Sequence, residues 1–406
     1  MPTRSEPRVV LLAETYHPVL GGGEKHTRSL ARGLAALGFS VDVITRRSSD
    51  DLPPLEDDDG VRIHRVGPSG QGRGKKFSMV PGALLRARRL ARNSDVLMNG
   101  GTRVLALPAR LAIAGTRCAL VLRPELNGEL DGSLALWGRR SRKLERRAVY
   151  GLARMRNVLL RGAGAVVAIS EAISREAVSA GFPAGKVHRI PHGIDMSEYA
   201  PVSAGQKAAQ RGILGLPTDK TLVTYTGRLI EGKGLETLFA AIGALADVPE
   251  LHLVLVGSGS GQVISIEDQL RKLAERAELR GRVTFTGRVD NVAAHLQASD
   301  LFVFPTLDEA LGMSAVEAQA CGLPTVASRT GGVPDIVEDG VTGILVPPGD
   351  EGALASGIRS LLADKGLRER FAAAARARAE ERFALPTSVG RYADLFRSLA
   401  ASRRTA

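Results

Sequence analysis

The feature that most constrains the fold is a repeated alternation of short apolar runs with amphipathic stretches, which continues through almost all of the 406 residues. This pattern is typical of βα units and of parallel sheets that are buried on both faces. A chain of this length also exceeds what a single hydrophobic core usually supports. The sequence therefore predicts an α/β protein with two doubly wound, Rossmann-like domains.

Two series of strands are expected, and a segment rich in proline and polar residues separates them. We predict an N-terminal domain over residues 1–190, a linker over 191–210 and a C-terminal domain over 211–386. Three helical segments end the chain, at residues 351–363, 367–383 and 387–402. The strands are expected at residues 9–13, 41–45, 62–66, 96–99, 118–122, 166–169 and 187–190, and then at 221–226, 251–256, 283–286, 301–304, 325–327 and 343–346.

Positive charge is concentrated in the first half of the chain. Residues 1–190 carry 32 Lys and Arg against 17 Asp and Glu, whereas residues 191–406 carry 23 against 26. The net charge of the whole chain is +12. The positive electrostatic potential of the first half favours binding to an acidic partner, either anionic lipid or a phosphorylated acceptor. The alternative is an arginine-rich composition that only reflects the base composition of the genome. We expect no nucleic-acid partner.

The remaining composition indicates a cytoplasmic protein. No apolar run reaches the roughly 18 residues that a membrane helix needs, and the N-terminus shows no apolar signal core. The two cysteines, Cys118 and Cys321, lie in apolar surroundings and are expected to be buried free thiols.

A glycine run follows the first predicted strand. Gly21-Gly22-Gly23-Glu24 precedes an amphipathic segment that reads as a helix over residues 24–37. Glycines before a helix start let the backbone approach a ligand and present N–H groups to an anion. A plain flexible loop is the alternative interpretation.

A second glycine-rich segment joins a predicted strand to a helix. It reads Gly227-Arg228-Leu229-Ile230-Glu231-Gly232-Lys233-Gly234, so Arg228 and Lys233 are separated by four residues in a loop that contains three glycines. Both cations could reach one diphosphate. Two solvated surface cations are the alternative.

A pair of carboxylates follows the strand predicted at residues 301–304. Glu309 lies in the loop and Glu317 about a turn and a half into the next helix. One carboxylate could meet a sugar and the other a ribose, while the N–H groups of residues 311–314 point at an anion. Ordinary acidic residues at a helix start would look the same.

Together these segments resemble the family-4 retaining glycosyltransferases, which have the GT-B fold. Supporting matches are 190-Ile-Pro-His-Gly-Ile-Asp-195, 256-Val-Gly-Ser-Gly-259, 285-Phe-Thr-Gly-Arg-288 and 331-Gly-Gly-Val-Pro-Asp-Ile-Val-337, together with His26. The resemblance implies two domains that face each other across a cleft. It also implies that the C-terminal helix, 387–406, returns to the N-terminal domain.

The resemblance also assigns roles to the residues that match. It implies a retaining, metal-independent hexosyl transfer, without a cofactor, from a UDP- or GDP-sugar to a glycan, lipid-linked or small-molecule acceptor. Arg228, Lys233 and Glu309 would carry the catalysis. The residues implied to bind the donor are Gly22, Gly23, Arg228, Lys233, Arg288, Leu311, Gly312, Met313 and Glu317.

One segment departs from the family pattern. Many relatives place a histidine after the strand at residues 118–122, but here the chain reads Arg123-Pro124-Glu125-Leu126-Asn127-Gly128-Glu129. Either Asn127 or Glu129 supplies the acceptor-side contact, or that side is built differently. The acidic run Asp57-Asp58-Asp59 is interpreted as a solvated loop. A nucleotide-sugar 2-epimerase and a non-catalytic nucleotide-sugar-binding partner are the alternative functions.

Residues 137–161 predict a basic amphipathic helix. An apolar stripe of Leu144, Ala148, Leu152, Met155 and Leu159 is accompanied by arginines on the other faces. Such a helix either docks on anionic lipid at the inner membrane face, as a peripheral membrane contact, or packs its stripe on the domain's own sheet.

Overall fold

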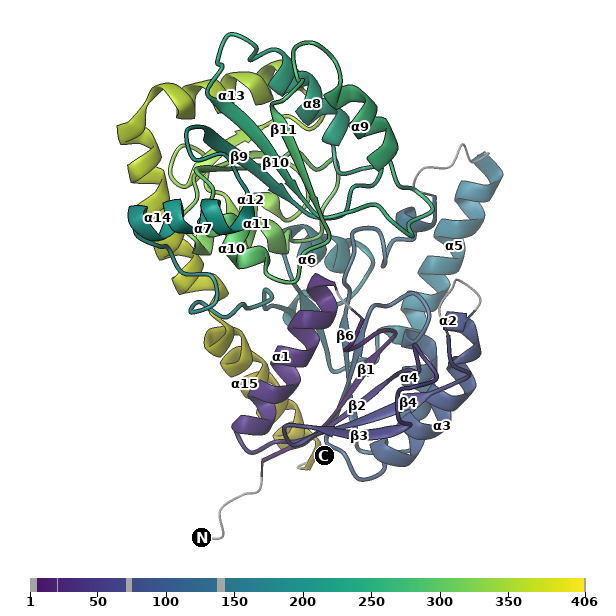
Figure 1. The fold of residues 1–406 in the computed structure, drawn as a ribbon. Helices are drawn as coiled ribbons and strands as arrows, with labels where there is room; N and C mark the ends of the chain where they lie inside the picture. The colour runs from purple at the N-terminus through teal and green to yellow at the C-terminus, as the bar shows by residue number, and fades with distance from the viewer. Residues whose placement is uncertain (1–5, 20, 71–74, 137–142, 405–406) are drawn as a thin grey trace. The chain divides into compact units, whose positions relative to one another are not determined.

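The structure is a computed structural model, and it describes residues 6–19, 21–70, 75–136 and 143–404. The chain divides into two compact units. The N-terminal unit comprises Met1–Gly193 with Leu385–Ala406, and the C-terminal unit comprises Ile194–Ala384. Each unit has its own sheet with helices on both faces (Figure 1).

The N-terminal unit holds an eight-stranded sheet in the order β3-β4-β2-β1-β5-β6-β7-β8. All neighbouring strands are parallel except β3, which pairs antiparallel with β4. The strands are β1 (Arg8–Ala13), β2 (Ser40–Arg46), β3 (Leu55–Asp58), β4 (Val61–Val66), β5 (Val96–Gly100), β6 (Ala119–Arg123), β7 (Ala165–Ala168) and β8 (Val187–Arg189).

Helices pack on both faces of this sheet and form two cores with it. One face packs against α1 (Gly22–Ala36) and α15 (Leu385–Arg404), whose Val389, Tyr392 and Phe396 are buried in that core. The C-terminal helix thus belongs to the N-terminal unit, as the GT-B resemblance implies. The other helices are α2 (Lys75–Ser78), α3 (Val80–Ala91), α4 (Ala106–Ala112), η1 (Ser133–Leu136), α5 (Lys143–Leu160), α6 (Glu171–Ser179) and η2 (Ala184–Lys186).

The C-terminal unit holds a six-stranded, all-parallel sheet in the order β11-β10-β9-β12-β13-β14. Every residue of the inner strand β10 is buried, as expected where helices cover a parallel sheet, whereas the edge strand β11 is half-buried along its length. The strands are β9 (Thr221–Thr226), β10 (Leu251–Val256), β11 (Val283–Gly287), β12 (Leu301–Phe304), β13 (Thr325–Ser328) and β14 (Gly343–Val346).

The helices of this unit begin inside the segment predicted as a linker. Residues 204–210 form the start of α7, which a capping box of Ser203 and Gln206 begins. The helices are α7 (Ala204–Leu214), α8 (Leu235–Gly243), α9 (Glu267–Ala274), α10 (Val292–Gln297), α11 (Met313–Ala320), α12 (Val333–Ile336), α13 (Glu351–Ala363) and α14 (Lys365–Phe383).

The strand order creates a topological switch point in each sheet. From β9 the chain crosses to β10 on one side, whereas β12 lies on the other side of β9. In the N-terminal sheet β1 lies in the same way between β2 and β5. Ligands of open α/β sheets bind at the carboxyl ends of the strands beside such a point. The loops after β9 and β12, and after β1 and β5, are therefore the places to look for a site.

The acidic run Asp57-Asp58-Asp59, interpreted from the sequence as a solvated loop, is exposed at Asp57 and Asp59 but buried at Asp58. Asp57 and Asp58 end β3, and the hairpin register turns the Asp58 side chain towards α1, where it is buried. Arg28 and Arg32, one turn apart on α1, both pair with it. The Arg28 hydrogen bond holds the pKa of Asp58 well below its usual range. Burial is thus compensated by charge.

Candidate donor site and the strand-end network

The two loops at the switch point of the C-terminal sheet meet through an ion pair. The Lys233 ammonium lies 2.7 Å from the Glu309 carboxylate, and both side chains are about four-fifths buried. Lys233 follows β9 and Glu309 follows β12, which are neighbouring strands. Two residues that are 76 positions apart in the sequence, and that were singled out separately, therefore form one centre.

Three glycines bring the backbone together at the ends of β9, β10 and β11. The N–H of Gly227 donates to Val256 O and the N–H of Gly257 donates to Gly287 O, each at 2.9 Å. Gly257 has φ +136°, and a Cβ there would collide with the Gly227 carbonyl oxygen. The close approach thus requires glycine. The residues that follow Gly227 and Gly287, Arg228 and Arg288, are both exposed at this edge.

The loop that carries Arg228 and Lys233 is fixed along its length. The Tyr225 hydroxyl donates to the Arg228 carbonyl at 3.2 Å, and the Leu307 N–H donates to Gly232 O at 3.0 Å. Gly234 starts α8 in the left-handed region, at φ +66°, and any Cβ there would collide with the Pro305 carbonyl oxygen. The two cations are therefore held by a rigid backbone rather than by a mobile surface loop.

The loop after β12 ends at the N-terminus of α11. Gly312 precedes the helix at φ +104°, and the first helical hydrogen bond runs from Ala315 N to Gly312 O at 2.9 Å. The N–H groups of Met313 and Ser314 come before that bond, so they are orphan donors of the helix start. Leu311 is buried and turns its side chain away from solvent. This end of α11 suits an anion.

Glu317 lies farther along α11 and has different surroundings. The Tyr199 hydroxyl donates a hydrogen bond to its carboxylate; burial, followed by this carboxylate, raises the pKa of Tyr199. Burial and the same carboxylate raise the pKa of the Cys321 thiol to about 12. Glu309 and Glu317 thus occupy separate environments in the C-terminal unit.

Of the two residues considered for the acceptor side, Glu129 is buried in the interior of the N-terminal unit. Its Oε2 accepts hydrogen bonds from the Thr102 N–H at 2.6 Å and from the Thr102 hydroxyl at 2.9 Å. Burial raises the pKa of Glu129 to about 7. Asn127 is only half-buried, on the loop that leads to Glu129.

Sequence reasoning missed Glu125, which connects the same loop to the glycine-rich helix start. Its Oε1 accepts from the buried Arg123 guanidinium at 2.6 Å, and its Oε2 lies 3.4 Å from His192 Nε2. A Cβ on Gly23 would lie 3.8 Å from that Oε2. The signal was the pair of opposite charges, Arg123 and Glu125, at the end of β6.

A histidine stack completes this network. The rings of His26, from α1, and His192 lie 3.9 Å apart and nearly parallel. Burial lowers the pKa of both histidines well below the usual value, so both rings are neutral. The Arg123 guanidinium also donates to Thr27 on α1 at 2.7 Å. His26, which the family resemblance includes, therefore lies inside the network and away from solvent.

Gly22 and Gly23 form the first turn of α1 instead of preceding it. The helix begins two residues before the predicted start, and Gly21 is its N-cap. Glycine is tolerated there because the first N–H groups of a helix have no partners within it. The Thr15 hydroxyl donates to Glu24 at 2.6 Å and so fixes the loop after β1 to this turn.

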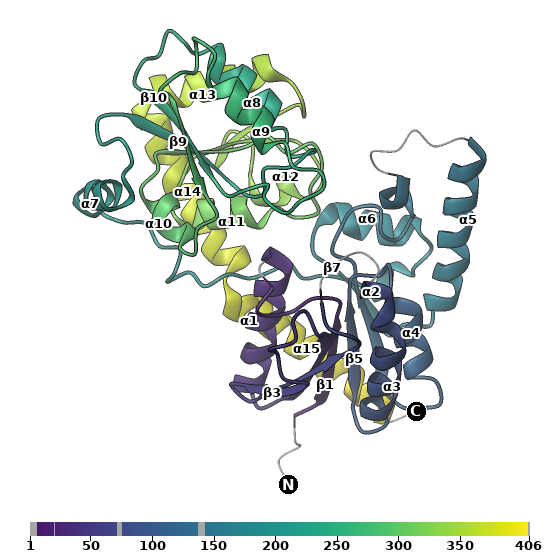
Figure 2. The same ribbon diagram turned by 45° about the vertical axis from the view of Figure 1, so that its right-hand side comes forward.

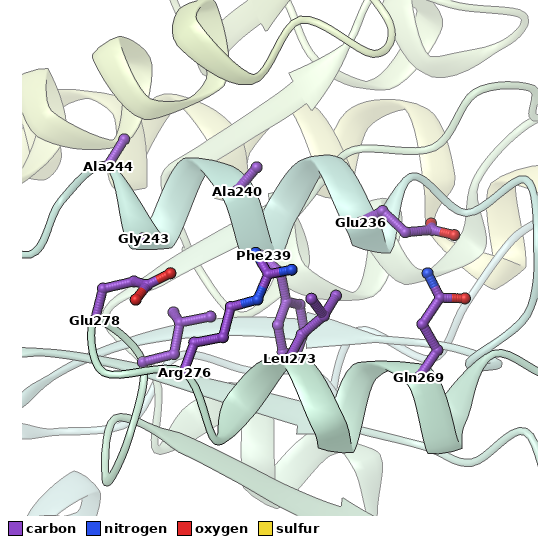
Figure 3. A pocket seen from close by; sticks show the side chains of 10 residues that line it. Glu236, Phe239, Ala240, Gly243, Ala244, Gln269, Leu273, Arg276 and Glu278 are labelled. Atoms are coloured by element: carbon purple, nitrogen blue, oxygen red, sulfur yellow. The ribbon is translucent and has the colours of Figure 1, made fainter.

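The surface hollow of about 550 Å³ in the C-terminal unit is separate from these residues. It lies between α8 and α9 and is lined by residues such as Glu236, Phe239, Gln269 and Arg276 (Figure 3). None of the predicted donor-binding residues lines it. Among the described residues, no group of three or more His, Cys, Asp or Glu side chains could hold a metal ion.

Comparisons with known proteins identify the family of this chain. The glycosyl transferases group 1 family matches residues 206–378, and the glycosyltransferase family 4 matches residues 20–198. The D-inositol 3-phosphate glycosyltransferase of Xylanimonas cellulosilytica is 31% identical over the full length of both chains. This chain belongs to the family-4 glycosyltransferases.

Solved structures of similar shape agree with the fold described above. Sucrose-phosphate synthase from Thermosynechococcus elongatus superimposes with a TM-score of 0.82 at 27% identity, over 98% of this chain and all of that one. The Anabaena protein HepE in complex with UDP-glucose gives 0.75 at 23% identity, over 97% of this chain and all of that one. The latter likeness concerns the fold alone. This family-4 glycosyltransferase thus has the GT-B fold.

Proposed function

We propose that this glycosyltransferase moves a sugar from a nucleotide-diphosphate donor to an acceptor hydroxyl with retention of the anomeric configuration. The Lys233–Glu309 pair at the switch point of the C-terminal sheet carries the proposal. Around it lie the exposed Arg228 and the N-terminus of α11. Two cations beside helix-start N–H groups suit a diphosphate.

The cations and the carboxylates have separate roles in this proposal. Arg228 and Lys233 neutralise the charge that develops on the departing diphosphate. Glu309 orients the Lys233 ammonium and faces the transferred sugar with the N–H groups of Leu311, Gly312 and Met313. Glu317 accepts hydrogen bonds from the ribose, and main-chain groups near Arg288 contact the base.

The reaction proposed is front-face transfer. The acceptor oxygen forms its bond to the anomeric carbon on the face from which the diphosphate oxygen leaves. The acceptor proton passes to that leaving oxygen, so the products are the glycoside and the nucleoside diphosphate. The step requires neither a protein nucleophile nor a metal ion, because the two cations compensate the negative charge.

The acceptor side is proposed to involve the loop after β6. Glu125 is partly exposed and lies beside Gly23, whereas Glu129 is buried against Thr102. Glu125 is therefore a better candidate than Glu129 for a polar contact to substrate. Gly22 and Gly23 retain the role that the family resemblance implies, contact with the donor phosphates.

A panel of donors and acceptors tests the proposal. Since HepE binds UDP and UDP-glucose, UDP-sugars come first and GDP-sugars second. D-inositol 3-phosphate is the first acceptor, because the Xylanimonas relative is named for it, followed by lipid-linked and glycan acceptors. Release of nucleoside diphosphate should depend on the acceptor, the product should keep the donor's anomeric configuration, and EDTA should not change the rate.

Three outcomes would overturn parts of the proposal. A product of inverted configuration excludes front-face transfer. A sugar epimerised without any acceptor supports a 2-epimerase instead. Binding of the nucleotide sugar without turnover, with every acceptor tried, supports a non-catalytic binding protein.

A further inference from the structure

Helix α5 (Lys143–Leu160) exposes the apolar stripe that the sequence identified. Leu144 is 78% exposed, Leu152 62%, Met155 60% and Leu159 56%. Ala148, the fifth member of the stripe, is exposed as well. The alternative in which this stripe packs on the domain's own sheet is therefore wrong. Residues 137–142, which were predicted to begin the helix, lie outside the described residues.

The opposite side of α5 is the one that packs on the N-terminal unit. Its buried residues are Ala153, Asn157 and Leu160. At 3.6 residues per turn these lie about half a turn away from the stripe. Asn157 donates to the Leu130 carbonyl at 2.7 Å, and Arg156 donates to the Glu129 carbonyl at 2.7 Å. The helix is thus firmly attached by one side, and the apolar side points outward.

The first half of α5 has no buried residue. From Lys143 to Leu152 every residue is exposed except Val149, which is half-buried. Figures 1 and 2 both show this end of α5 extending beyond α4, while its other end lies beside α4. On α4, Leu107 and Leu111 are also exposed. Exposed apolar side chains that recur along one face of a helix, as they do on α5, mark an interaction surface.

Cations border the stripe. Arg147 and Arg154, two turns apart and both exposed, lie along one edge of it. Arg154 also lines a hollow of about 350 Å³ together with Arg161, Tyr150 and Asn157, and with one acidic residue, Asp131. An outward apolar stripe next to a hollow with two guanidinium groups matches the interface of an anionic bilayer, where acyl chains lie beneath charged phosphates.

We propose that α5 docks this protein on the surface of an anionic phospholipid bilayer. Leu144, Leu152, Met155 and Leu159 insert at the boundary between headgroups and acyl chains. Arg154 and Arg161 receive a lipid phosphate in the hollow beside the stripe. A second copy of this chain is a poorer occupant, because two such helices would bring their bordering arginines together, and like charges repel.

Vesicle sedimentation of the full chain tests the proposal. The wild type should pellet with vesicles of phosphatidylcholine that contain phosphatidylglycerol, more at low salt than at high salt, and hardly with phosphatidylcholine alone. The triple variant Leu152→Asn, Met155→Asn, Leu159→Asn should lower the partition coefficient about tenfold or more. Arg154→Gln with Arg161→Gln should lower it several-fold and reduce the salt dependence.

Matched controls come from the C-terminal unit. Ile213→Asn with Val263→Asn replaces two side chains that are more than 80% exposed, and Lys272→Gln with Arg276→Gln removes two exposed cations. Both controls should pellet like the wild type. The α5 variants should fold, because the substituted apolar side chains are exposed. Circular dichroism spectra and melting curves like those of the wild type would show this.

Several results would overturn the proposal. In one, the wild type fails to pellet with anionic vesicles at low salt; in another, the controls lose binding as much as the α5 variants do. A wild type that is dimeric by sedimentation velocity without lipid, and becomes monomeric through the triple variant, assigns the stripe to a second copy instead. Glycosyl transfer to a water-soluble acceptor provides a separate readout, so failure of the proposed function would be recognised independently.

Discussion

At the carboxyl ends of β9, β10 and β11 three glycines bring the backbone together, whereas at the end of β6 the chain turns into a network of buried charged side chains. In the first region Arg228 and Arg288 are exposed beside this backbone. In the second, Arg123 is buried and its charge is compensated by Glu125, whose carboxylate keeps the pKa of the guanidinium high although burial opposes the charge. The same sheet architecture thus ends in two different ways.

The difference indicates that the strand ends of the two units have different roles. An edge of glycines and outward cations leaves donors for a ligand's phosphates. An edge of mutually paired side chains gives a preorganised wall in which few groups, Glu125 foremost, remain partly accessible. Substitutions at the first edge should therefore change binding and turnover, while those at the second should change the stability of the N-terminal unit.

The largest effect is expected from Phe396→Ala on α15. Phe396 is fully buried in the core that α15 shares with α1 and β1. Its loss should destabilise the N-terminal unit by about 4 kcal/mol. Hydrogen exchange should speed up in β1 and β5 and stay unchanged in β9 and β12. Phe371→Ala on α14, which is also buried, should give the reverse pattern. Equal changes in both sheets would mean that the two units do not unfold separately.

A somewhat smaller effect is expected from the two cations of the glycine edge. Arg228→Ala and Lys233→Ala should each lower kcat/KM roughly a hundredfold, which corresponds to a loss of about 3 kcal/mol of transition-state stabilisation. The double variant should lose less than the sum, because both groups act on one diphosphate. Lys272→Gln, on the exposed side of α9, should behave as the wild type. Wild-type kinetics in either single alanine variant would contradict the assignment.

Replacing each of the two carboxylates that follow β12, Glu309 and Glu317, should have a different effect. Glu317→Ala should weaken binding of free nucleoside diphosphate by about 2 kcal/mol, roughly thirtyfold, because it removes the ribose contact. Glu309→Ala should leave that affinity nearly unchanged and chiefly lower kcat. Tyr199→Phe removes the hydroxyl that donates to Glu317 and should cost only a few-fold. Calorimetric titration with UDP measures all three, and equal losses for the two carboxylate variants would refute the division.

Much of this architecture could be predicted because apolar runs report burial directly. The parallel strands were found within one or two residues, and the glycines at the ends of β9, β10 and β11 lie where the structure brings backbone close to backbone. Strand β3 was missed because Leu55-Glu56-Asp57-Asp58 has neither apolar alternation nor strand-favouring residues. It forms because Arg28 and Arg32 on α1 compensate Asp58. That compensation is a tertiary effect, which no local pattern contains.

The direction in which a side chain points was the second feature that the sequence did not predict. The periodicity of α5 showed that Leu152, Met155 and Leu159 share one face, but a period does not say whether that face points to the sheet or to solvent. Ala153, Asn157 and Leu160 occupy the inner side instead. In the loop after β6, similarly, the sequence offered several polar residues. Only the structure shows that Glu129 turns inward to Thr102 while Glu125 stays partly exposed.

The smallest expected effect concerns the pH dependence of the buried network. Burial raises the pKa of Glu129 to about 7, from an ordinary value of 4.5. Between these values the native protein keeps a proton that the unfolded chain loses, so the contribution of Glu129 to stability is full below about pH 4.5 and is lost as the pH rises towards 7. The free energy of unfolding of the N-terminal unit should therefore fall by about 1–2 kcal/mol between pH 5 and pH 7.

Glu129→Gln cannot ionise and mimics the protonated acid, so its stability should lack this decline. Glu250→Gln, an exposed carboxylate in the C-terminal unit, serves as the control and should keep it. Hydrogen exchange of β1 and β5 at several pH values measures the difference, and parallel pH profiles for wild type and Glu129→Gln would show that Glu129 is ionised in the folded protein throughout this range.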